Sequence, residues 1–211
     1  MQTYSFIQCD VFTQQAFGGN PLAVFPEGEG IADAMMQTIA REMNLSETVF
    51  VLPPTDAKAL RRLRIFTPGT ELPMAGHPVV GTWNVLARIG VVAPPDSGNG
   101  IVTIYQELKV GVLPVAIEFA DGEPIKVVMT QPPPQIGEPL EIKDAVAHAL
   151  SLSVDEIGFD QFPIAIASTA VPYLMAPVRT RQALSHIVIN STALSDLIRQ
   201  TGVSGVYAVS P

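Results

Sequence analysis

The chain begins with alternating apolar and polar positions. Residues 4–13, YSFIQCDVFT, alternate aromatic or branched side chains with polar ones, which is typical of a half-buried strand. A glycine-rich turn at 17–20 separates this segment from a second extended run, PLAVFPE, at 21–27. Another apolar run, ETVFVLPP, follows at 47–54. These segments predict strands joined by tight loops.

A further strand is predicted at 60–69, LRRLRIFTPG. Leu63 and Ile65 alternate there with Arg62 and Arg64. Because successive side chains of a strand point to opposite faces, this alternation predicts one buried face and one face in water.

Helical spacing of apolar residues appears in two places. Residues 31–43, IADAMMQTIAREM, have the spacing of an amphipathic helix, and Asn44 is suited to end it. A central helix is predicted near 77–89, where HPVVGTWNVLARIG is apolar almost all round and Gly90 follows. A helix that is apolar on every side is expected to be enclosed by protein.

The second part of the chain mixes strands and helices again. Short strands with turn residues between them are predicted from 101 to 131, and the densest proline segment, QPPPQIGEP, follows at 131–139. We therefore expect one lobe at 1–130 and part of a second at 131–211. The last strand has too few predicted neighbours to complete a sheet, so we expect the second lobe to be truncated.

Composition and charge exclude several classes of function. A net charge of −8, without a Lys/Arg stripe, disfavours binding to nucleic acid. Cys9 is the only cysteine, so an internal disulfide or a cysteine-based metal site is excluded, and His148 and His186 lack metal-ligand spacing. No signal peptide and no apolar run of about 20 residues is found, so we expect a cytoplasmic protein that does not enter membranes.

Glu47 is one candidate for chemistry. It lies between a helix and an apolar strand, with Ser46 beside it. Apolar surroundings disfavour the ionised carboxylate, which suits a group that both takes and gives a proton. A glutamate exposed at a strand edge is the simpler interpretation from these residues alone.

His77 follows Gly76 at the predicted helix start. The free N–H groups of a first helical turn attract anions, and glycine lets a ligand approach the backbone closely. A carboxylate-bearing substrate would fit there, with the imidazole as donor or proton carrier. The alternative is that His77 serves only as an N-terminal cap, and the spacing does not decide between them.

Several stretches together resemble one family. They are DVFTQQAFGGNPLAVF, REMNLSETVFV, RIFTPGTELPMAGHPVVGT, VVMTQPPP and STAVPYLMAPV. In order and spacing they are similar to the PhzF-like isomerases of phenazine biosynthesis, whose fold is shared with diaminopimelate epimerase and proline racemase. The resemblance implies an α+β fold of two similar lobes, each a curled, largely antiparallel sheet around a central apolar helix, with the active site between the lobes.

The resemblance also implies roles for individual residues. Glu47 corresponds to the family's general acid/base, and His77 with Gly76 to the motif that lines the cleft. Substrate contacts are expected from the other matched positions, Ser46, Gly19, Asn20, Ser168 and Thr169. Diaminopimelate epimerase has a catalytic thiol where this chain has Ala75, so the implied chemistry is proton transfer at carbon by a carboxylate, with neither metal nor organic cofactor.

The family's second lobe carries an acidic-x-Ala-Thr-Gly-Ser motif that this chain lacks. The leading hypothesis is a cofactor-independent isomerase or epimerase that acts on a small carboxylate-bearing metabolite. A homodimer is compatible with this hypothesis. The alternative is an inactive fragment or a small-molecule binding protein of the same fold. A nucleotide-binding or redox enzyme is disfavoured because FGGN at 17–20 is read as a turn and no dinucleotide motif is found.

Overall fold

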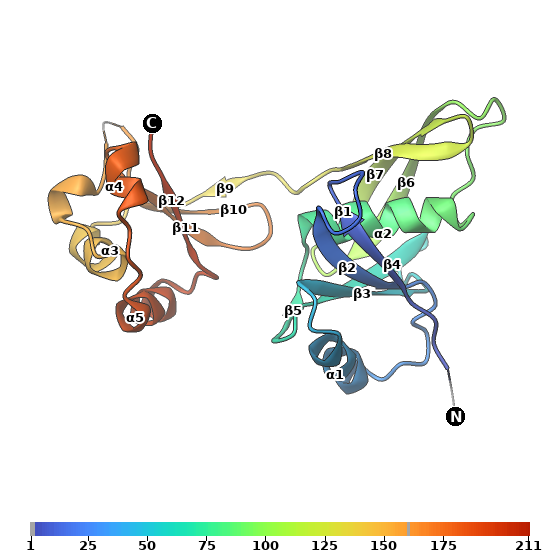
Figure 1. Cartoon of the computed structure of the whole chain (residues 1–211), viewed down its shortest axis with the longest axis horizontal. Helices are drawn as coiled ribbons and strands as arrows, with labels where there is room; N and C mark the ends of the chain where they lie inside the picture. Colours follow the sequence, from blue (N-terminus) through green and yellow to red (C-terminus); the bar gives the residue numbers. More distant parts are fainter. Residues whose placement is uncertain (1–2, 160) are drawn as a thin grey trace. The chain divides into compact units, whose positions relative to one another are not determined.

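The computed structural model describes residues 3–159 and 161–211. The chain divides into two compact units, Met1–Gln131 and Pro132–Pro211 (Figure 1). The boundary falls at the start of the proline-rich segment. Each unit has its own sheet and helices and is described separately.

The N-terminal unit contains one mixed sheet with the strand order β1-β2-β3-β4-β6-β7-β8, and β5 pairs with β4. The pairs β2–β3 and β4–β6 are parallel, and the other pairs are antiparallel. The strands are β1 (Ile7–Val11), β2 (Asn20–Phe25), β3 (Glu47–Leu52), β4 (Arg61–Phe66), β5 (Glu71–Leu72), β6 (Gly100–Leu108), β7 (Gly111–Ala120) and β8 (Glu123–Met129).

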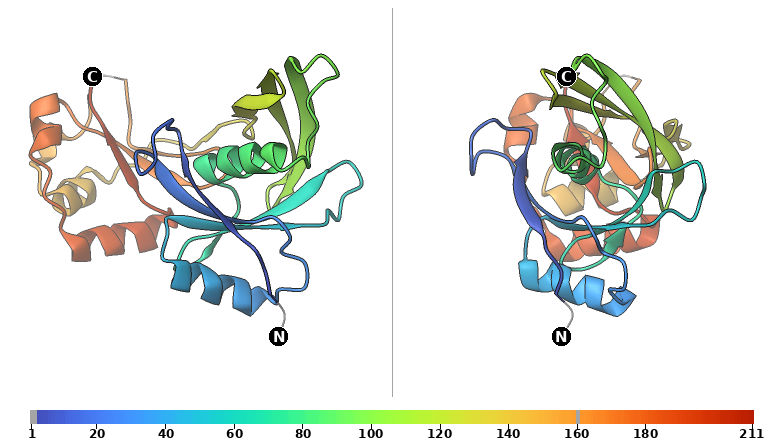
Figure 2. Two further views of the ribbon diagram at one scale, coloured as in Figure 1. Left: turned by 45° about the vertical axis from the view of Figure 1, so that its right-hand side comes forward. Right: turned by 90° about the vertical axis from the view of Figure 1, so that its right-hand side faces the viewer.

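Helix α2 (Gly76–Arg88) lies inside the curl of this sheet. It contacts β1 and β8, which stand at opposite ends of the strand order, and also β2 and β3. The view along the helix in Figure 2 shows the strands around it. Val79, Trp83 and Leu86 are fully buried. The predicted enclosed helix is therefore present, because an all-round apolar surface is removed from water only when the sheet surrounds it.

Two features hold α2 closely against its strands. A Cβ added at Gly81 would lie 2.5 Å from Cγ2 of Val11 and 2.7 Å from Cδ2 of Leu22, so only glycine allows this approach. On another side, Nε1 of Trp83 donates a hydrogen bond of 2.7 Å to Oε1 of Gln106, and both residues are buried. The indole N–H is thus paired within the core.

Helix α1 (Asp33–Met43) covers the outer face of β3 and β4 and ends at Asn44, which has a left-handed backbone. Its Met36 and Ala40 pack with Phe50 and Leu52 of β3 in one apolar cluster. Because side chains alternate along a strand, the intervening residues of β3, including Glu47 at its start, face α2.

The C-terminal unit has a four-stranded sheet in the order β12-β11-β10-β9, in which only the β11–β12 pair is parallel. One core joins Leu174 and Ala176 of the sheet to Ala147 and Leu197 of the helices. Its elements are β9 (Gln135–Ile136), α3 (Lys143–Leu150), the short 3-10 helix η1 (Val154–Glu156), β10 (Ala165–Ser168), β11 (Tyr173–Pro177), α4 (Arg181–Ser185), α5 (Ser191–Thr201) and β12 (Val206–Val209).

The second face of the C-terminal sheet is exposed. Tyr173 and Tyr207 alternate with the core residues of their strands, and Ile136 of β9 pairs with Ala167. The side chains of Ile136, Tyr173 and Tyr207 are 77, 40 and 59% exposed. With Met175 they line a shallow apolar cavity of about 520 Å³. The C-terminal sheet therefore has one covered and one open face.

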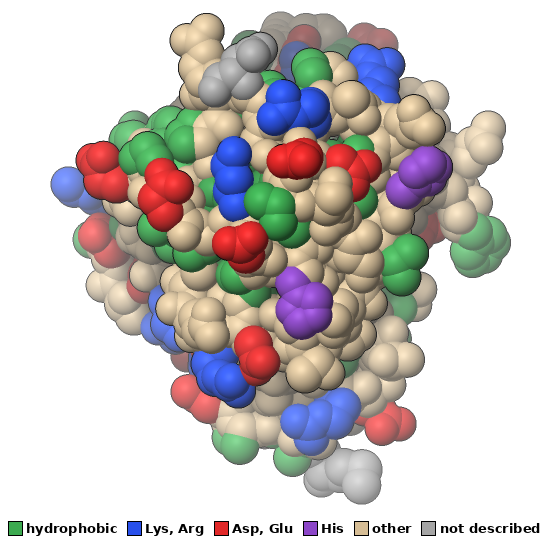
Figure 3. Space-filling model, turned by 90° about the vertical axis from the view of Figure 1, so that its left-hand side faces the viewer, with side chains coloured by type: hydrophobic (Ala, Val, Ile, Leu, Met, Phe, Trp, Pro, Cys, Tyr) green, Lys and Arg blue, Asp and Glu red, His purple; other side chains and the backbone are tan. Residues whose placement is uncertain are grey.

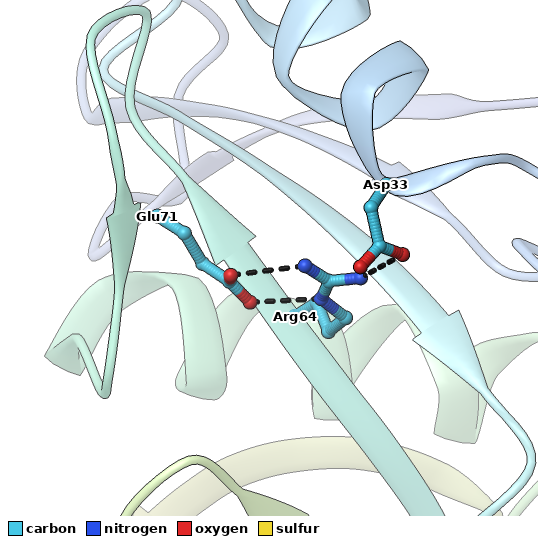
Figure 4. Close-up of polar contacts among 3 residues, drawn as sticks. All are labelled: Asp33, Arg64 and Glu71. Carbon is cyan, nitrogen blue, oxygen red and sulfur yellow. Dashed lines mark hydrogen bonds and ion pairs between the residues drawn. The ribbon is translucent and has the colours of Figure 1, made fainter.

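One expectation about the sheet is wrong. Arg64 was placed on a face in water, but its side chain is only 17% exposed. It lies between Glu71 of β5 and Asp33 at the start of α1 (Figure 4). The alternation of side chains was correct, but α1 covers the face that the alternation alone assigned to solvent.

Candidate functional site

Glu47 and His77 are brought together from different elements. Glu47 is the first residue of β3, in register with Leu22 of β2, and its side chain is 15% exposed. His77 is the second residue of α2, and its side chain is 12% exposed. Since Glu47 faces the concave side of the sheet and α2 begins there, the two side chains meet at the end of the helix.

The contact between them is short. Nε2 of His77 lies 2.9 Å from Oε2 of Glu47, and both atoms are buried. The two atoms are close enough to share a proton, but they are not aligned as a regular hydrogen bond, and neither has another partner within the described residues. The pair is thus an acid and a base in contact, largely shielded from water.

The other ring nitrogen of His77 faces Asn20, the first residue of β2. Nδ2 of Asn20 lies 3.5 Å from Nδ1 of His77. Asn20 is exposed, so this end of the group is open to solvent. Asn20 and Glu47 therefore approach the same imidazole ring from its two nitrogens.

No side chain caps the N-terminus of α2. Ala75 is the N-cap residue, it offers no side-chain hydrogen bond, and the first turn carries no acidic residue. A Cβ added at Gly76 would meet nothing within 4 Å. The interpretation of His77 as an N-terminal cap is therefore wrong, because its ring is directed to Glu47 and Asn20 instead. The free N–H groups at this helix end remain suited to a carboxylate.

The remaining predicted site residues have no side-chain hydrogen bond or ion pair with Glu47 or His77 among the described residues. Gly19 precedes Asn20, and a Cβ there would lie 2.3 Å from the carbonyl oxygen of Val11, which gives this glycine a packing role. Ser46 is exposed just before β3. Ser168 and Thr169 belong to the C-terminal unit and line its apolar cavity of about 520 Å³. Substrate contacts by these residues stay a prediction.

A larger cavity lies elsewhere in the N-terminal unit. Its volume is about 1030 Å³, and its lining includes Tyr4, Glu29 and Arg61 as well as Leu52, the last residue of β3. Glu47 starts that strand, and six residues of extended chain separate its two ends by roughly 17 Å. This cavity is therefore distinct from the Glu47–His77 contact, and neither of those two residues lines it.

The sequence did not predict the ion pairs that Arg64 forms with Glu71 and Asp33. Its Nε and Nη2 atoms donate to the two carboxylate oxygens of Glu71 at 2.8 and 2.9 Å, and Nη1 donates to Asp33 at 2.6 Å (Figure 4). The hydrogen bond from Arg64 holds the pKa of Glu71 below its usual value, and the pKa of Arg64 is raised in return. Glu71 is six positions before His77, so this network fixes the strand that leads into α2.

Other charged groups give no sign of a second reactive centre. On the face shown in Figure 3, acidic and basic side chains are interspersed. Burial, with a smaller effect of Asp10, raises the pKa of the Cys9 thiol, which disfavours the reactive thiolate. Across residues 3–159 and 161–211, no three His, Cys, Asp or Glu side chains are grouped as metal ligands would be. In the same ranges, no helix is long and apolar enough to cross a membrane.

Comparisons with known proteins agree with these observations. A family model described as a phenazine biosynthesis-like protein matches residues 9–211. The chain is 40% identical over 200 residues to an uncharacterized isomerase of Mesorhizobium japonicum, which covers 93% of this chain and 63% of that protein. It is 34% identical over 197 residues to the trans-2,3-dihydro-3-hydroxyanthranilate isomerase of Pseudomonas aeruginosa, which covers 92% of this chain and 64% of that protein. The chain thus spans somewhat less than two thirds of these relatives.

Solved structures show the same relationship. The PhzF-family phenazine biosynthesis protein of Bacillus anthracis aligns with a TM-score of 0.76 at 27% identity, covering all of this chain and 67% of that one. A probable proline racemase of Agrobacterium radiobacter shares the fold alone, with a TM-score of 0.62 at 16% identity, covering 99% of this chain and 66% of that one. The predicted α+β fold of the epimerase and racemase type is confirmed. Because the family model matches nearly the whole chain, this protein belongs to the phenazine biosynthesis-like (PhzF-like) family.

Proposed function

We propose that this protein is an isomerase or epimerase that moves a proton on a small carboxylate-bearing metabolite, without a cofactor. The observation that carries the proposal is the 2.9 Å contact between Glu47 and His77 at the open N-terminus of α2. An acid/base pair shielded from water thus lies beside a helix end that suits the carboxylate of a substrate. The names of the related isomerases support the same class of reaction.

Glu47 is assigned the proton transfer. Abstraction of a proton from carbon needs a base near that carbon and away from bulk water, and the carboxylate of Glu47 is 15% exposed. The same group then delivers the proton to a second carbon on the same face of the substrate. His77 holds the carboxylate in place by its contact with Oε2.

The substrate's carboxylate is assigned to the first turn of α2. The N–H groups near Gly76 have no competing acidic side chain in that turn, and the space beside Gly76 is open. A helix N-terminus favours an anion at such a position by about 0.3–1 kcal/mol when it is exposed. A substrate held there presents its neighbouring carbons to the strand end that carries Glu47.

Deuterium exchange tests this proposal directly. The chain is incubated in deuterated water with trans-2,3-dihydro-3-hydroxyanthranilate and with a panel of small carboxylates, and label at carbon is followed by NMR. We expect exchange into at least one compound, and loss of that exchange in Glu47→Gln with binding retained, because Gln keeps the size of the side chain but cannot carry the proton. Absence of exchange with every compound would favour a binding protein instead.

The control variant is Glu123→Gln. Glu123 also starts a strand, but it is exposed and pairs with Arg88 at the far end of α2. Its replacement is expected to leave both exchange and binding unchanged. Equal exchange in Glu47→Gln and in the parent chain would contradict the role assigned to Glu47.

A further inference from the structure

We propose that the outer face of strands β6, β7 and β8 is an interaction surface for a second copy of this chain. This surface, the β6–β8 face, consists of Ile101, Thr103, Tyr105, Pro114, Ala116, Glu118, Lys126 and Val128. The proposal concerns assembly and does not depend on the reaction assigned to Glu47.

The register of the strands shows which side chains lie on this face. Gln106 of β6 bonds Trp83 of α2, so its even-numbered neighbours in β6 point inward and the odd-numbered ones point outward. In β7 the inward side chains include Val115 and Ile117, which are fully buried. The outward positions pair across the three strands in two rows, Thr103–Ala116–Val128 and Ile101–Glu118–Lys126.

The β6–β8 face is apolar and uncovered. Ile101, Tyr105 and Val128 are 65, 49 and 49% exposed. Of the two helices described within residues 3–131, α2 lies on the inner side of the sheet and α1 packs on β3 and β4 (Figure 2). Apolar side chains that share one exposed sheet face are typical of a site for a partner, because their burial is favourable.

The free edge of β8 is protected, although β8 ends the strand order. A partner strand that paired with this edge would extend the sheet. Pro124 lies near the start of β8, Ile125 is the extra residue of a β-bulge, and Lys126 is exposed. Proline, bulges and lysine are the usual means of blocking edge pairing. We therefore place the partner on the face and not on the edge.

The charges on the face indicate that the partner is a second copy. Glu118 and Lys126 lie opposite each other on neighbouring strands. A two-fold dimer uses the same surface twice. An axis along the strands, between β7 and β8, therefore brings Glu118 of each copy over Lys126 of the partner subunit. The same axis brings the small Ala116 over Val128 of the partner subunit.

The size of the face sets the expected strength of the dimer. Strand β8 has seven residues. Three strands of this length, about 4.8 Å apart and with a rise of about 3.3 Å per residue, present a flat area of roughly 350 Å² per copy. A standard stable interface covers about 800 Å² per partner. We therefore expect a weak dimer that forms as the protein concentration rises.

Concentration dependence of the parent chain is the first test. Sedimentation velocity and amide NMR spectra are recorded from about 10 µM to about 1 mM protein. We expect the sedimentation coefficient to rise and the amide shifts of 101–105, 114–118 and 126–128 to change with it. A chain that stays monomeric over this range would overturn the proposal, and so would shifts confined to the open face of the C-terminal sheet.

Two charge reversals test the two-fold arrangement. Glu118→Lys and Lys126→Glu each turn both contacts between the copies into like-charge contacts, so each variant alone should associate at least about tenfold more weakly than the parent. An equimolar mixture of the two variants should recover association, because the lysines of one variant then face the glutamates of the other. A mixture that associates no better than the separate variants would overturn the proposal.

The control variant is Lys58→Glu. Lys58 is exposed in the loop between β3 and β4, outside the β6–β8 face, and its reversal changes the net charge as much as Lys126→Glu does. Association should match the parent, and a tenfold loss would assign the effect to general repulsion and overturn the proposal. Fluorescence of Trp83, the only tryptophan, reports folding. If a variant does not fold, the concentration-dependent shifts of the parent decide the question.

Discussion

The two units use their sheets differently. In the N-terminal unit, α1 covers the outer face of β3 and β4, and the sheet curls around α2 on its inner face. The outer face of β6 and β8 is open, with Ile101, Tyr105, Ile125 and Val128 exposed. The sheet of the C-terminal unit packs helices against one face, while Ile136, Tyr173 and Tyr207 of the other face are exposed. Burial of apolar surface contributes about 25 cal/mol per Å², so β3 and β4 gain from both faces, whereas the C-terminal sheet gains from one.

The Glu47–His77 contact belongs to the part of the N-terminal sheet that is covered on both faces. Glu47 and His77 are held by a buried strand and an enclosed helix, and each element is fixed by its neighbours on both sides. Ser168 and Thr169 lie at the end of a strand with an open apolar face. A reactive pair needs rigid supports, and β3, which is covered on both faces, supplies one of them.

The largest expected effect comes from the helix inside the sheet. Leu86→Ala removes a fully buried side chain of α2, and we expect the free energy of unfolding to fall by about 2–5 kcal/mol. Chemical denaturation followed by Trp83 fluorescence measures it. Ile89→Ala, just past the helix end and 48% exposed, is the control and should cost less than about 1 kcal/mol. Equal costs would mean that α2 is not enclosed.

The next effect concerns ion pairs. Glu71→Gln removes the two-bond partner of Arg64, and we expect a loss of about 1–3 kcal/mol at neutral pH. In the C-terminal unit the Arg199–Asp196 pair is exposed, so Asp196→Asn should cost less than about 0.5 kcal/mol. Similar losses in both variants would show that covering by α1 does not strengthen the Arg64 pair.

The same ion pair predicts a dependence on pH. The pKa of Glu71 is lower in the folded chain, so its stabilisation is complete above the usual range of glutamate, about pH 4.3, and is lost as pH falls through the folded pKa. The stabilities of the parent and of Glu71→Gln should therefore converge in acid. A difference that stays constant from pH 7 to pH 3 would assign the loss to packing.

A smaller effect is expected from the close approach of α2 to its strands. Gly81→Ala improves helix propensity by up to about 1 kcal/mol but forces a Cβ to 2.5 Å from Val11, so we expect a net loss of about 1–2 kcal/mol. Thermal unfolding measures it. Gly76→Ala meets nothing within 4 Å and should be neutral, and a stabilised Gly81→Ala would show that the sheet is not tight around the helix.

The smallest effect is expected on the open face of the C-terminal sheet. Ile136→Ser replaces a side chain that is 77% exposed, and the free energy of unfolding should change by less than about 0.5 kcal/mol. Denaturation followed by circular dichroism measures it, with buried Leu174→Ala of the same sheet as the costly counterpart, at about 2–5 kcal/mol. A large cost for Ile136→Ser would mean that this face is covered in solution.

The periodicity of the sequence indicated the elements, and the family resemblance indicated the class of fold. The apolar surface all around 77–89 required an enclosing sheet, and the observed α2 begins at Gly76 and ends at Arg88. The left-handed Asn44 ends α1 as its position in the sequence indicated. The motifs around Glu47 and His77 indicated the family, because the types and order of residues in a motif can be read from the sequence without any distance between them.

Only the tertiary structure decided which side chains meet. His77 follows Glu47 by 30 positions and Asn20 by 57. No local sequence pattern predicts that Glu47 and Asn20 both contact the imidazole of His77. Strand order placed β2 beside β3, and the curl of the sheet brought the start of α2 to both. In the same way, α1 covers Arg64, although the alternation of side chains along the strand predicted that Arg64 faces water. Local periodicity fixes the direction of a side chain, whereas its partners depend on long-range packing of the whole sheet.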